Sequence, residues 1–446
     1  MPQFVKYPAT VESVSTEKAG ALEAFGCSLE DTSDILLKNI KSFPTTSEFI
    51  AYASPDSTYA VTKRLMDSAK KSILIGIYDF SASYMKALLR NAMIRGVKVS
   101  LMLDINSTAE QQLMKDLSTF GAETVAAPSC SSKFIHYFSN SHEKVIVIDD
   151  TWVMVQSGNY SENSIPFNEK DGGDPANFRT GNRDMGVAIK SKPLADFFTK
   201  VLRGDMKLEL DAEGTEALLE ASTKDFPLLV EAAPAKIPVK LFKSKSFNPT
   251  NKIKVLPVLS PDNYMSVVPG FLKSATKSIF IEQQYIRSNQ KAVGQLLLAI
   301  REAMDAHPNM DVRIILGKIF SKADIKKEKA NLDNLNKKFG LKLGTNVRYI
   351  DTDRFVHCHN KLIVVDNQSL LVSSQNWSDT AVLQNREAGL MFEFPEIARY
   401  YAGIFEADWS TAKKTLPQVG APETISPTKV AKGNFIEVSP ADYMEV

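Results

Sequence analysis

The sequence has few cysteines, no long apolar run and no excess of charge of one sign. Its three cysteines, Cys27, Cys130 and Cys358, are odd in number and are not spaced as metal ligands. We therefore expect no disulfide framework, and a reducing compartment is the simplest interpretation. This excludes the class of small secreted proteins that disulfides hold together.

Apolar runs and net charge exclude further classes. No window reaches the length of about 18 uninterrupted apolar residues that a membrane-spanning helix needs, and the first residues lack the apolar core of a secretory signal. We expect a cytoplasmic or otherwise soluble protein without a transmembrane segment. The 53 basic and 52 acidic residues nearly cancel. This balance argues against a protein that holds nucleic acid by overall charge, although a local basic groove is compatible with it.

A repeated motif is the main feature that is present. HEKVIVIDDTWVMVQSGN starts at His142, and HNKLIVVDNQSLLVSSQN starts at His359. The two stretches agree at a constant offset in the pairs His142/His359, Lys144/Lys361, Asp149/Asp366, Ser157/Ser374 and Asn159/Asn376. Charged residues are only about a quarter of an ordinary sequence, so such a double match is rare by chance.

The repeat extends over most of the chain. Segments that begin at Ser54 and Ser260 both have the pattern of a loop, an amphipathic helix and a strand. Two further strands lie before Asp104 and Phe320, and GNRDMGVAI matches QNREAGLMF downstream. The first copy has extra residues in the stretch PFNEKDGGDPANFRTG, which we expect to be a loop at the rim of the active site.

This duplication predicts the domain organisation and the fold class. We expect an N-terminal extension (1–44), a first unit (45–203), a connector with a helical patch (204–249), a second unit (250–415) and a C-terminal extension along the surface (416–446). The alternation of strands and helices predicts the α/β class. We expect two homologous α/β sandwich units, with mixed and mostly parallel sheets flanked by helices, packed about a pseudo-two-fold axis.

The spacing within each motif brings its polar groups together. Residues i and i+2 of a strand share a face, so His142 and Lys144 project together while Glu143 points away. Lysine, serine and asparagine side chains donate hydrogen bonds that suit the oxygens of a phosphoryl group. The residues predicted to bind phosphate are Ser157, Asn159, Ser374 and Asn376.

The duplication also gives one site two histidines. A neutral imidazole can attack phosphorus, but the departing alkoxide needs a proton from the opposite side. Each unit has one motif histidine, so two packed units place His142 and His359 on opposite sides of one phosphate. The predicted catalytic residues are these two histidines together with Lys144 and Lys361.

Both motifs match the pattern HxKxxxxD, and in this the chain resembles the phospholipase D superfamily, in particular its bacterial-type phospholipases D. The resemblance implies a phosphohistidine intermediate, no metal and no cofactor. It implies His142 as the nucleophile, His359 as the general acid, and Asp184 and Glu387 as acids that each orient a histidine. The chain departs from the family pattern at Asp184, where glutamate is more usual, and in the Gln-Ser pair before Gly158.

Two sets of motif residues have an alternative interpretation. Asp149 and Asp366 lie at the far end of the motif strand, so a structural role in a turn or an ion pair competes with a catalytic one. The HCH sequence at 357–359 suggests a zinc site, but the first unit has Asn140 at the position of the first of these histidines, which disfavours a metal.

Other residues allow more than one interpretation as well. The lysine-rich segment 321–344 predicts a solvated helix face, which would alternatively contact anionic lipid or nucleic acid. His136 and His307 follow no pattern. The residues that would line a substrate channel, or else belong to the core, are Tyr78, Phe80, Tyr285 and Ile286.

The function that the resemblance implies is that of a phospholipase D. Such an enzyme hydrolyses glycerophospholipids to phosphatidic acid and transfers the phosphatidyl group to alcohols. The alternatives are a nuclease that acts on nucleic acid and a transferase similar to cardiolipin or phosphatidylserine synthases. A catalytically inactive scaffold is disfavoured because both motifs keep histidine and lysine. The expected partners are a phospholipid at a membrane or micelle surface and a water or alcohol acceptor, with the protein as a monomer.

Overall fold

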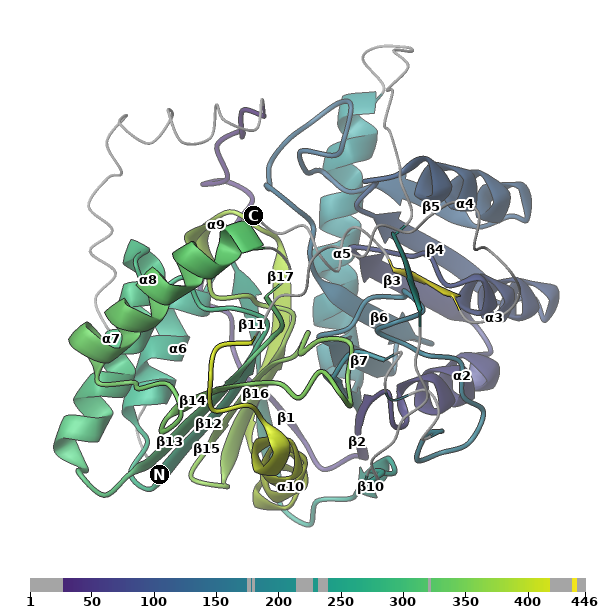
Figure 1. Cartoon of the computed structure of the whole chain (residues 1–446). Coiled ribbons are helices and arrows are strands. Elements are labelled where there is room, and N and C mark those ends of the chain that lie inside the picture. The colour runs from purple at the N-terminus through teal and green to yellow at the C-terminus, as the bar shows by residue number, and fades with distance from the viewer. Residues whose placement is uncertain are drawn as a thin grey trace.

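The computed structural model describes residues 27–174, 178, 181–213, 228–231, 240–319, 322–417 and 435–438. These residues form two α/β units that lie side by side, one mainly from each half of the chain (Figure 1). The predictions for the N-terminal start, for most of the connector and for most of the C-terminal extension concern residues outside these ranges. The unit boundaries drawn from the sequence stay predictions.

Each unit contains an eight-stranded sheet. The first sheet has the order β10 (Lys245–Phe247), β2 (Phe49–Ser54), β8 (Asp184–Lys190), β7 (Trp152–Gln156), β6 (Lys144–Ile148), β3 (Ser72–Ile77), β4 (Lys98–Leu103) and β5 (Glu123–Ala126). The second sheet has the order β1 (Phe43–Thr45), β11 (Ile253–Ser260), β17 (Glu387–Glu393), β16 (Ser369–Ser373), β15 (Lys361–Val365), β12 (Ser278–Gln283), β13 (Asp311–Leu316) and β14 (Val347–Tyr349). A separate pair consists of β9 (Leu228–Glu231) and β18 (Phe435–Val438).

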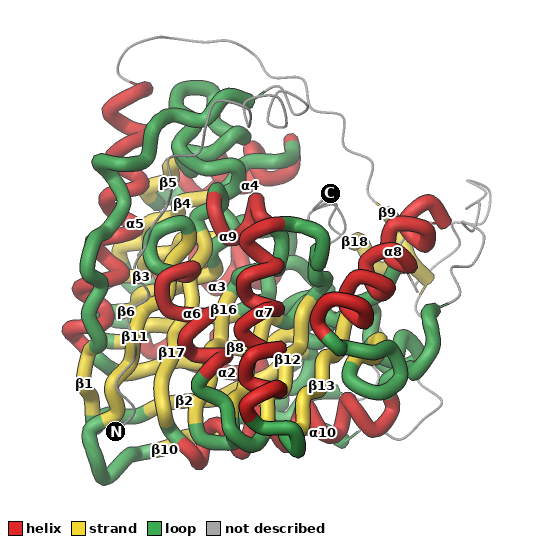
Figure 2. The backbone as a smooth tube through the Cα atoms, turned by 90° about the vertical axis from the view of Figure 1, so that its left-hand side faces the viewer, coloured by secondary structure: helices red, strands yellow, loops and turns green. Residues whose placement is uncertain are grey.

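Helices flank both sheets. The first unit has α2 (Thr58–Ser68), α3 (Ser83–Ile94), α4 (Thr108–Thr119) and α5 (Lys192–Glu213). The second unit has α6 (Tyr264–Lys273), α7 (Lys291–Ala306), α8 (Lys322–Phe339), α9 (Asp379–Leu383) and α10 (Pro395–Thr411). Figure 2 shows α6 and α7 in front of the strands of the second sheet. Within the ranges that the structure covers, no helix is both long and apolar enough to cross a membrane.

The α/β class with two mixed sheets flanked by helices is confirmed, but the expected predominance of parallel strands is wrong. In each sheet only two neighbouring pairs are parallel, β3–β4 and β4–β5 in the first and β12–β13 and β13–β14 in the second. Tight turns explain the difference, because a hairpin joins antiparallel strands. Asp149 and Asp150 form such a turn between β6 and β7, with φ angles of 53° and 52°.

The two units exchange their leading strands. β1 precedes the first unit in sequence but pairs with β11 of the second sheet, and β10 precedes the second unit but pairs with β2 of the first. One apolar core extends across both sheets and includes side chains of α5 and α10. In it, the ring of Phe49 packs on those of Phe392 and Phe394 at centroid distances of 5.4 Å. This shared core fixes the seam at which the motif residues meet.

A disulfide bond corrects the expectation from cysteine usage. Cys27 and Cys130 are bonded to each other, while Cys358 is a buried free thiol. The two partners lie 103 residues apart in sequence. They meet because the segment before β1 folds back along the loop that leads into the first motif, where Glu30 N donates a hydrogen bond to His136 O. Spacing could not predict a bond that depends on this packing.

Candidate active site

Both motif histidines lie at the seam between the units, and each is hydrogen-bonded through its backbone to the other unit. His142 lies two residues before the start of β6 at Lys144, and its N–H donates to Arg386 O at 2.7 Å. His359 has the same place before β15, and its N–H donates to Arg183 O at 3.0 Å. Both side chains are buried. The structure therefore places at one seam two histidines that are one full repeat apart in the sequence, at positions 142 and 359.

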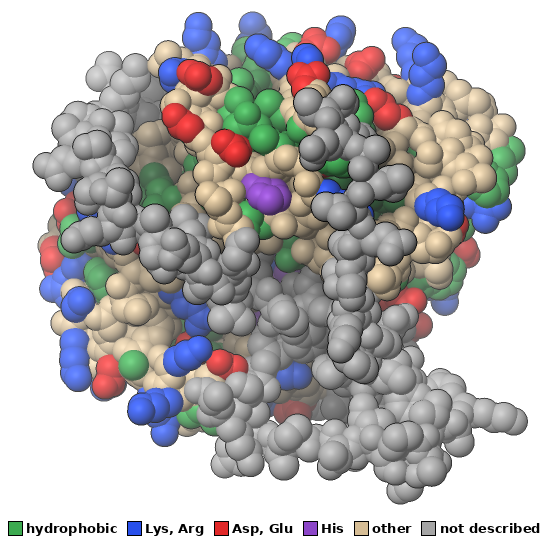
Figure 3. Space-filling view, turned by 90° about the horizontal axis from the view of Figure 1, so that it is seen from above, with side chains coloured by type: hydrophobic (Ala, Val, Ile, Leu, Met, Phe, Trp, Pro, Cys, Tyr) green, Lys and Arg blue, Asp and Glu red, His purple; other side chains and the backbone are tan. Residues whose placement is uncertain are grey.

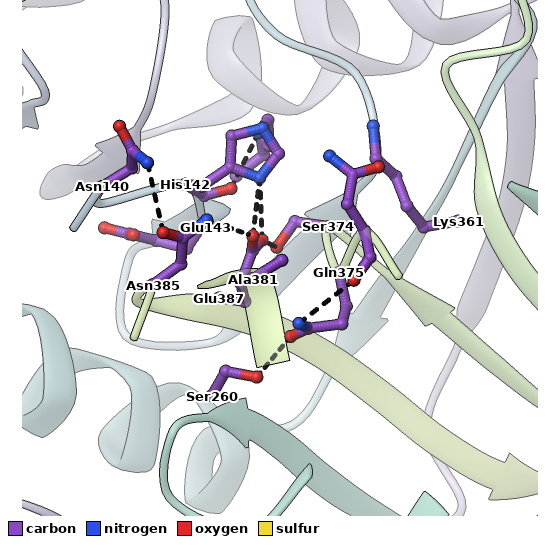
Figure 4. A network of polar contacts seen from close by, with 12 residues as sticks. Asn140, His142, Glu143, Ser260, Lys361, Ser374, Gln375, Ala381, Asn385 and Glu387 are labelled. Carbon is purple, nitrogen blue, oxygen red and sulfur yellow. Dashed lines mark hydrogen bonds and ion pairs between the residues drawn. The ribbon is translucent and has the colours of Figure 1, made fainter. Parts of the chain in front are cut away.

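Each histidine is paired with the acid of the opposite unit. Nδ1 of His142 lies 2.9 Å from both carboxylate oxygens of Glu387, as Figure 4 shows. Nδ1 of His359 lies 3.0 Å from Oδ1 of Asp184. A carboxylate accepts the Nδ1 proton, so Nε2 is the ring nitrogen that carries no hydrogen in the neutral imidazole. The sequence predicted that these acids hold the histidines, and the structure adds that the pairs are crossed.

The two serines contact these carboxylates. Ser157 Oγ donates to Asp184 Oδ1 at 2.7 Å and accepts a hydrogen bond from Met185 N at 3.0 Å. Ser374 Oγ donates in the same way to Glu387 Oε2 and accepts a hydrogen bond from Ala388 N at 3.0 Å. A hydroxyl has one hydrogen to donate, and here it is used. In the structure both serines hold the carboxylates, and their predicted role in phosphate binding stays a prediction.

Asp184 stays ionised in this setting. Burial alone raises the pKa of its carboxyl group, but His359, Lys361 and the Ser157 hydroxyl together outweigh burial and lower the pKa below its ordinary value. An ionised carboxylate stabilises a positive charge on the imidazole that it contacts. This is the state that a proton-donating histidine needs.

The motif lysines are buried beside the histidines. Lys144 Nζ donates to His142 O at 2.7 Å, and Lys361 Nζ donates to His359 O at the same distance. The other neighbours of the two histidine–lysine pairs differ between the units. The ring of Tyr78 lies against His142, with centroids 4.7 Å apart, whereas Lys361 also donates to Gln284 Oε1 at 3.2 Å. The sequence gave Tyr78 only as a channel or core residue and did not single out Gln284.

Two of the remaining predicted site residues are buried close to the serines, and two lie at the other ends of the motif strands. Asn159 and Asn376 are fully buried and lie two residues after the serines, and their role in phosphate binding stays a prediction. The structure places Asp149 and Asp366 at the far ends of the motif strands. Asp149 accepts from the N–H groups of Lys70–Ser72, and these bonds outweigh burial and lower its pKa.

Asp366 accepts in the same way from the N–H groups of Thr276, Lys277 and Ser278. Both aspartates have φ angles near +53°, at 53° and 54°. Aspartate tolerates this left-handed conformation better than most residues, since its short side chain can bond to nearby backbone. These contacts support the structural interpretation of both motif aspartates.

A third histidine lies near the site. His357 Nδ1 accepts a hydrogen bond from Lys318 N at 2.9 Å, and its ring centroid is 6.4 Å from that of His359. Burial, together with the positive groups of His359 and Lys361, holds the pKa of His357 well below its ordinary value. Gly317 makes room for the ring, because a Cβ there would lie 2.2 Å from its Cε1. Among the residues that the structure covers, no group of His, Cys, Asp and Glu side chains is arranged to hold a metal.

The other candidate residues lie in the core or make local contacts. Phe80 and Ile286 are core residues, and Tyr285 carries the guanidinium of Arg287 over its ring at 4.5 Å. His136 bonds to Ser132 O. The end of the extra loop adjoins the site, since Gly181 O accepts from the N–H of Val356.

A buried glutamate lies close to the motif residues in each unit, Glu143 directly before β6 and Glu282 within β12. The side chain of Glu143 has room because it lies against Gly76. A Cβ at position 76 would lie 2.9 Å from Glu143 Oε1. In the second unit Glu282 of β12 bonds to Asn360 Nδ2 at 2.8 Å. Burial and the negative charge of Asp205 raise the pKa of Glu143 to about 8. Burial and Asp408 raise the pKa of Glu282 to about 8 as well.

The raised pKa of Glu143 makes a prediction for stability. The pKa of Glu143 is higher in the folded protein than in the unfolded chain, so the folded state binds the proton more tightly. The free energy of unfolding of the wild type therefore falls as pH rises from about 4.5 to about 8. Glu143→Gln cannot ionise. We expect the variant to gain about 2–4 kcal/mol in free energy of unfolding over wild type on going from pH 5 to pH 9.

Urea unfolding at both pH values measures this difference. Glu396→Gln, a change of an exposed glutamate on α10, is the matched control and should show the same pH dependence as wild type. Parallel pH profiles of Glu143→Gln and wild type would contradict the prediction.

The duplicated fold and the paired His–Lys motifs define a two-unit enzyme of the class that cleaves or transfers phosphodiesters. Residues 62–206 and 270–409 match the family described as "Cardiolipin synthase, PLD-like domain". The chain belongs to this family and thus to the phospholipase D superfamily.

Individual proteins are similar over different parts of the chain. A stretch of 71 residues is 35% identical to the mitochondrial cardiolipin hydrolase of Danio rerio; it covers 16% of this chain and 31% of that relative, less than a third of its length. The phosphatidylserine synthase of Haemophilus influenzae Rd KW20 shares the fold, with a TM-score of 0.56 and 15% identity over 84% of this chain and 89% of its own. Nuc of Salmonella typhimurium, a phospholipase D family member, is 23% identical over 37% of this chain and 96% of its own, with a TM-score of 0.29.

Proposed function

We propose that the protein transfers the phosphatidyl group of glycerophospholipids through a phosphohistidine, to water as a phospholipase D or to an alcohol as a phosphatidyltransferase. The observation that carries this proposal is the crossed arrangement of the site. Each of two buried histidines has a lysine beside it and an acid from the other unit on its Nδ1 atom. Two named relatives, a cardiolipin hydrolase and a phosphatidylserine synthase, support a phospholipid substrate.

The proposed reaction has two steps. Nε2 of His142 attacks phosphorus, the bond to the head-group oxygen breaks, and His359 gives that oxygen a proton. His359 then takes a proton from water or an alcohol, whose oxygen displaces His142 from phosphorus. Lys144 and Lys361, with Asn159 and its counterpart in the second unit, would stabilise the charge on the phosphoryl oxygens. The chemistry of these residues requires no metal or other cofactor.

The surface charge supports lipid over nucleic acid. On the described part of the face seen in Figure 3, basic and acidic side chains are interspersed instead of forming a field of one sign. Helix α8 is rich in lysine. Its exposed lysines are Lys326, Lys327, Lys329, Lys337 and Lys338.

Helix α8 is anchored close to the site. Asn334 Nδ2 donates to Ser288 O at 2.7 Å, and Ser288 N donates to Asn331 Oδ1 at 2.8 Å. Ser288 belongs to the loop that follows β12, and the same loop begins with Gln284, which accepts a hydrogen bond from Lys361. We propose that the lysines of α8 contact anionic head groups when the site engages a lipid surface.

Phosphatidylethanol is the expected product that tests the proposed function. Water and ethanol would compete for the same phosphohistidine, so phosphatidylcholine or cardiolipin in detergent micelles with about 1 M ethanol should yield phosphatidylethanol beside phosphatidic acid. Thin-layer chromatography of labelled lipid measures both. The yield should be the same with EDTA present.

Two results would contradict this proposal. Cleavage of single-stranded DNA without any lipid product would replace it with the nuclease alternative. Loss of activity in EDTA that zinc or magnesium restores would overturn the metal-free mechanism. A phosphatidyl product with ethanol but no hydrolysis in its absence would identify the transferase form of the proposal.

Reversing the charge of α8 should weaken activity at lipid surfaces. Each lysine near an anionic surface contributes about 1 kcal/mol, so Lys326→Glu, Lys327→Glu and Lys329→Glu together should lower the ratio of vesicle turnover to soluble diester turnover by about 10- to 100-fold. The turnover ratio is measured with vesicles that contain one third phosphatidylglycerol and with a soluble diester.

The matched control reverses three exposed lysines of α5 in the first unit, namely Lys192, Lys200 and Lys207. Equal effects of the α5 and α8 variants would show that overall charge matters and that α8 has no particular role.

A further inference from the structure

A buried arginine directly precedes each histidine-orienting acid. Arg183 lies before Asp184 and Arg386 lies before Glu387, and the two arginines are 1% and 2% exposed. A guanidinium this deeply buried needs carboxylate partners to offset its lost hydration. The sequence gave these arginines no role.

Arg183 joins the two units through its side chain. Nη1 donates to Asp56 Oδ2 at 2.5 Å, within the first unit. Nε and Nη2 donate to the two carboxylate oxygens of Asp408 at 2.7 and 3.2 Å, and Asp408 lies on α10 of the second unit. The ring of Phe355 lies 4.4 Å from the guanidinium carbon.

Arg386 repeats this arrangement with the units reversed. Nη1 donates to Asp262 Oδ2 at 2.6 Å, within the second unit. Nη2 and Nε lie 2.9 and 2.8 Å from the carboxylate oxygens of Asp205, which lies on α5 of the first unit. The ring of Phe138 lies 4.3 Å from the guanidinium carbon.

The backbone of each arginine contacts the motif of the opposite unit on both sides. Arg386 N donates to Asn140 O at 2.9 Å and Arg386 O accepts from His142 N at 2.7 Å. Arg183 N donates to His357 O at 2.8 Å and Arg183 O accepts from His359 N at 3.0 Å. A shift of either arginine therefore moves a histidine backbone and the adjoining acid together.

The exchanged leading segments also contact these clusters. Leu37 N donates to Asp262 Oδ1 at 2.7 Å, and Phe242 N donates to Asp56 Oδ1 at 2.8 Å. In each cluster, the aspartate from the arginine's own unit, Asp262 or Asp56, is thus held in turn by the segment that precedes the opposite unit. The same arrangement therefore occurs in both units, next to both histidine–carboxylate pairs.

We propose that Arg386 and Arg183 are positioning residues that each hold one crossed histidine–carboxylate pair in register. Arg386 serves the pair of the nucleophile His142, and Arg183 serves the pair of His359. These roles rest on the proposed function and add to it the step that each arginine supports.

The two steps can be separated with a suitable leaving group. p-Nitrophenolate is stable without a proton, so its release from bis(p-nitrophenyl) phosphate depends on attack by His142 and little on His359. Breakdown of the phosphohistidine does need His359, which takes the proton of the attacking water. Release and breakdown therefore report on the two arginines separately.

The test uses Arg386→Lys and Arg183→Lys in the full chain, with enzyme in excess over substrate. We expect Arg386→Lys to slow p-nitrophenolate release by about 10- to 100-fold. Arg183→Lys should leave release within about 3-fold of wild type and lengthen the lifetime of the phosphoenzyme, measured after alkaline quenching, by about 10- to 100-fold.

Asp205→Asn and Asp408→Asn provide a second pair of variants in case either lysine variant does not fold. Asp205→Asn should slow release as Arg386→Lys does, and Asp408→Asn should slow breakdown as Arg183→Lys does. Equal losses in both steps for both arginines, or no loss in either, would overturn the positioning roles while wild type stays active. A wild-type protein that releases no p-nitrophenolate would instead overturn the proposed function.

Discussion

His142→Ala and His359→Ala are each expected to lower turnover of a phospholipid diester by about 10⁴-fold or more. The first change removes the atom that forms the bond to phosphorus. The second removes the proton donor for the leaving alkoxide and the base for the second step. The measurement is release of head group from a labelled phospholipid, normalised to protein that passes a thermal melting check.

The two variants should differ in what they accumulate. Only His359→Ala, given a substrate with a good leaving group, is expected to hold an acid-labile phosphate, and peptide mapping should place it on His142. Phosphate trapped on His359 in the His142→Ala protein would reverse the assignment of nucleophile and acid. His307→Ala, a change at the C-terminal end of α7 far along the chain from either motif, is the control and should retain wild-type turnover.

Glu387→Gln is expected to lower kcat/KM by about 10³- to 10⁴-fold although it preserves the shape of the side chain. Glu387 accepts from Nδ1 of His142 and from the Ser374 hydroxyl, so a neutral amide removes the charge that fixes the tautomer and stabilises the ring as it attacks. Steady-state kinetics on a soluble diester measure the loss.

Ser374→Ala is the matched comparison for this change, because it removes one donor to Glu387 and leaves its charge. A loss of about 10- to 100-fold is expected there, as for other groups that orient a catalytic residue without touching substrate. If Ser374→Ala were as damaging as Glu387→Gln, the serine would have to act on the substrate itself, as the sequence first suggested.

The sequence by itself determined the parts of the site. The order of His, Lys, Asp, Ser and Asn, written twice, identified the catalytic candidates, and the period of two along a strand placed histidine and lysine on one face. These features are local, since they depend on spacings of a few residues that one strand or one turn can satisfy. Asp184 and Glu387 came instead from the resemblance to the phospholipase D superfamily.

Only the tertiary structure decided which parts meet. His142 and Glu387 are 245 positions apart, and their contact depends on a core that both units share and on strands that the units exchange. The Cys27–Cys130 bond and the arginine clusters also join distant residues, which are 103 positions apart in the disulfide and 181 and 225 positions apart in the arginine–aspartate pairs between the units. No local pattern encodes such pairs, because each is set by how two independently patterned surfaces pack together.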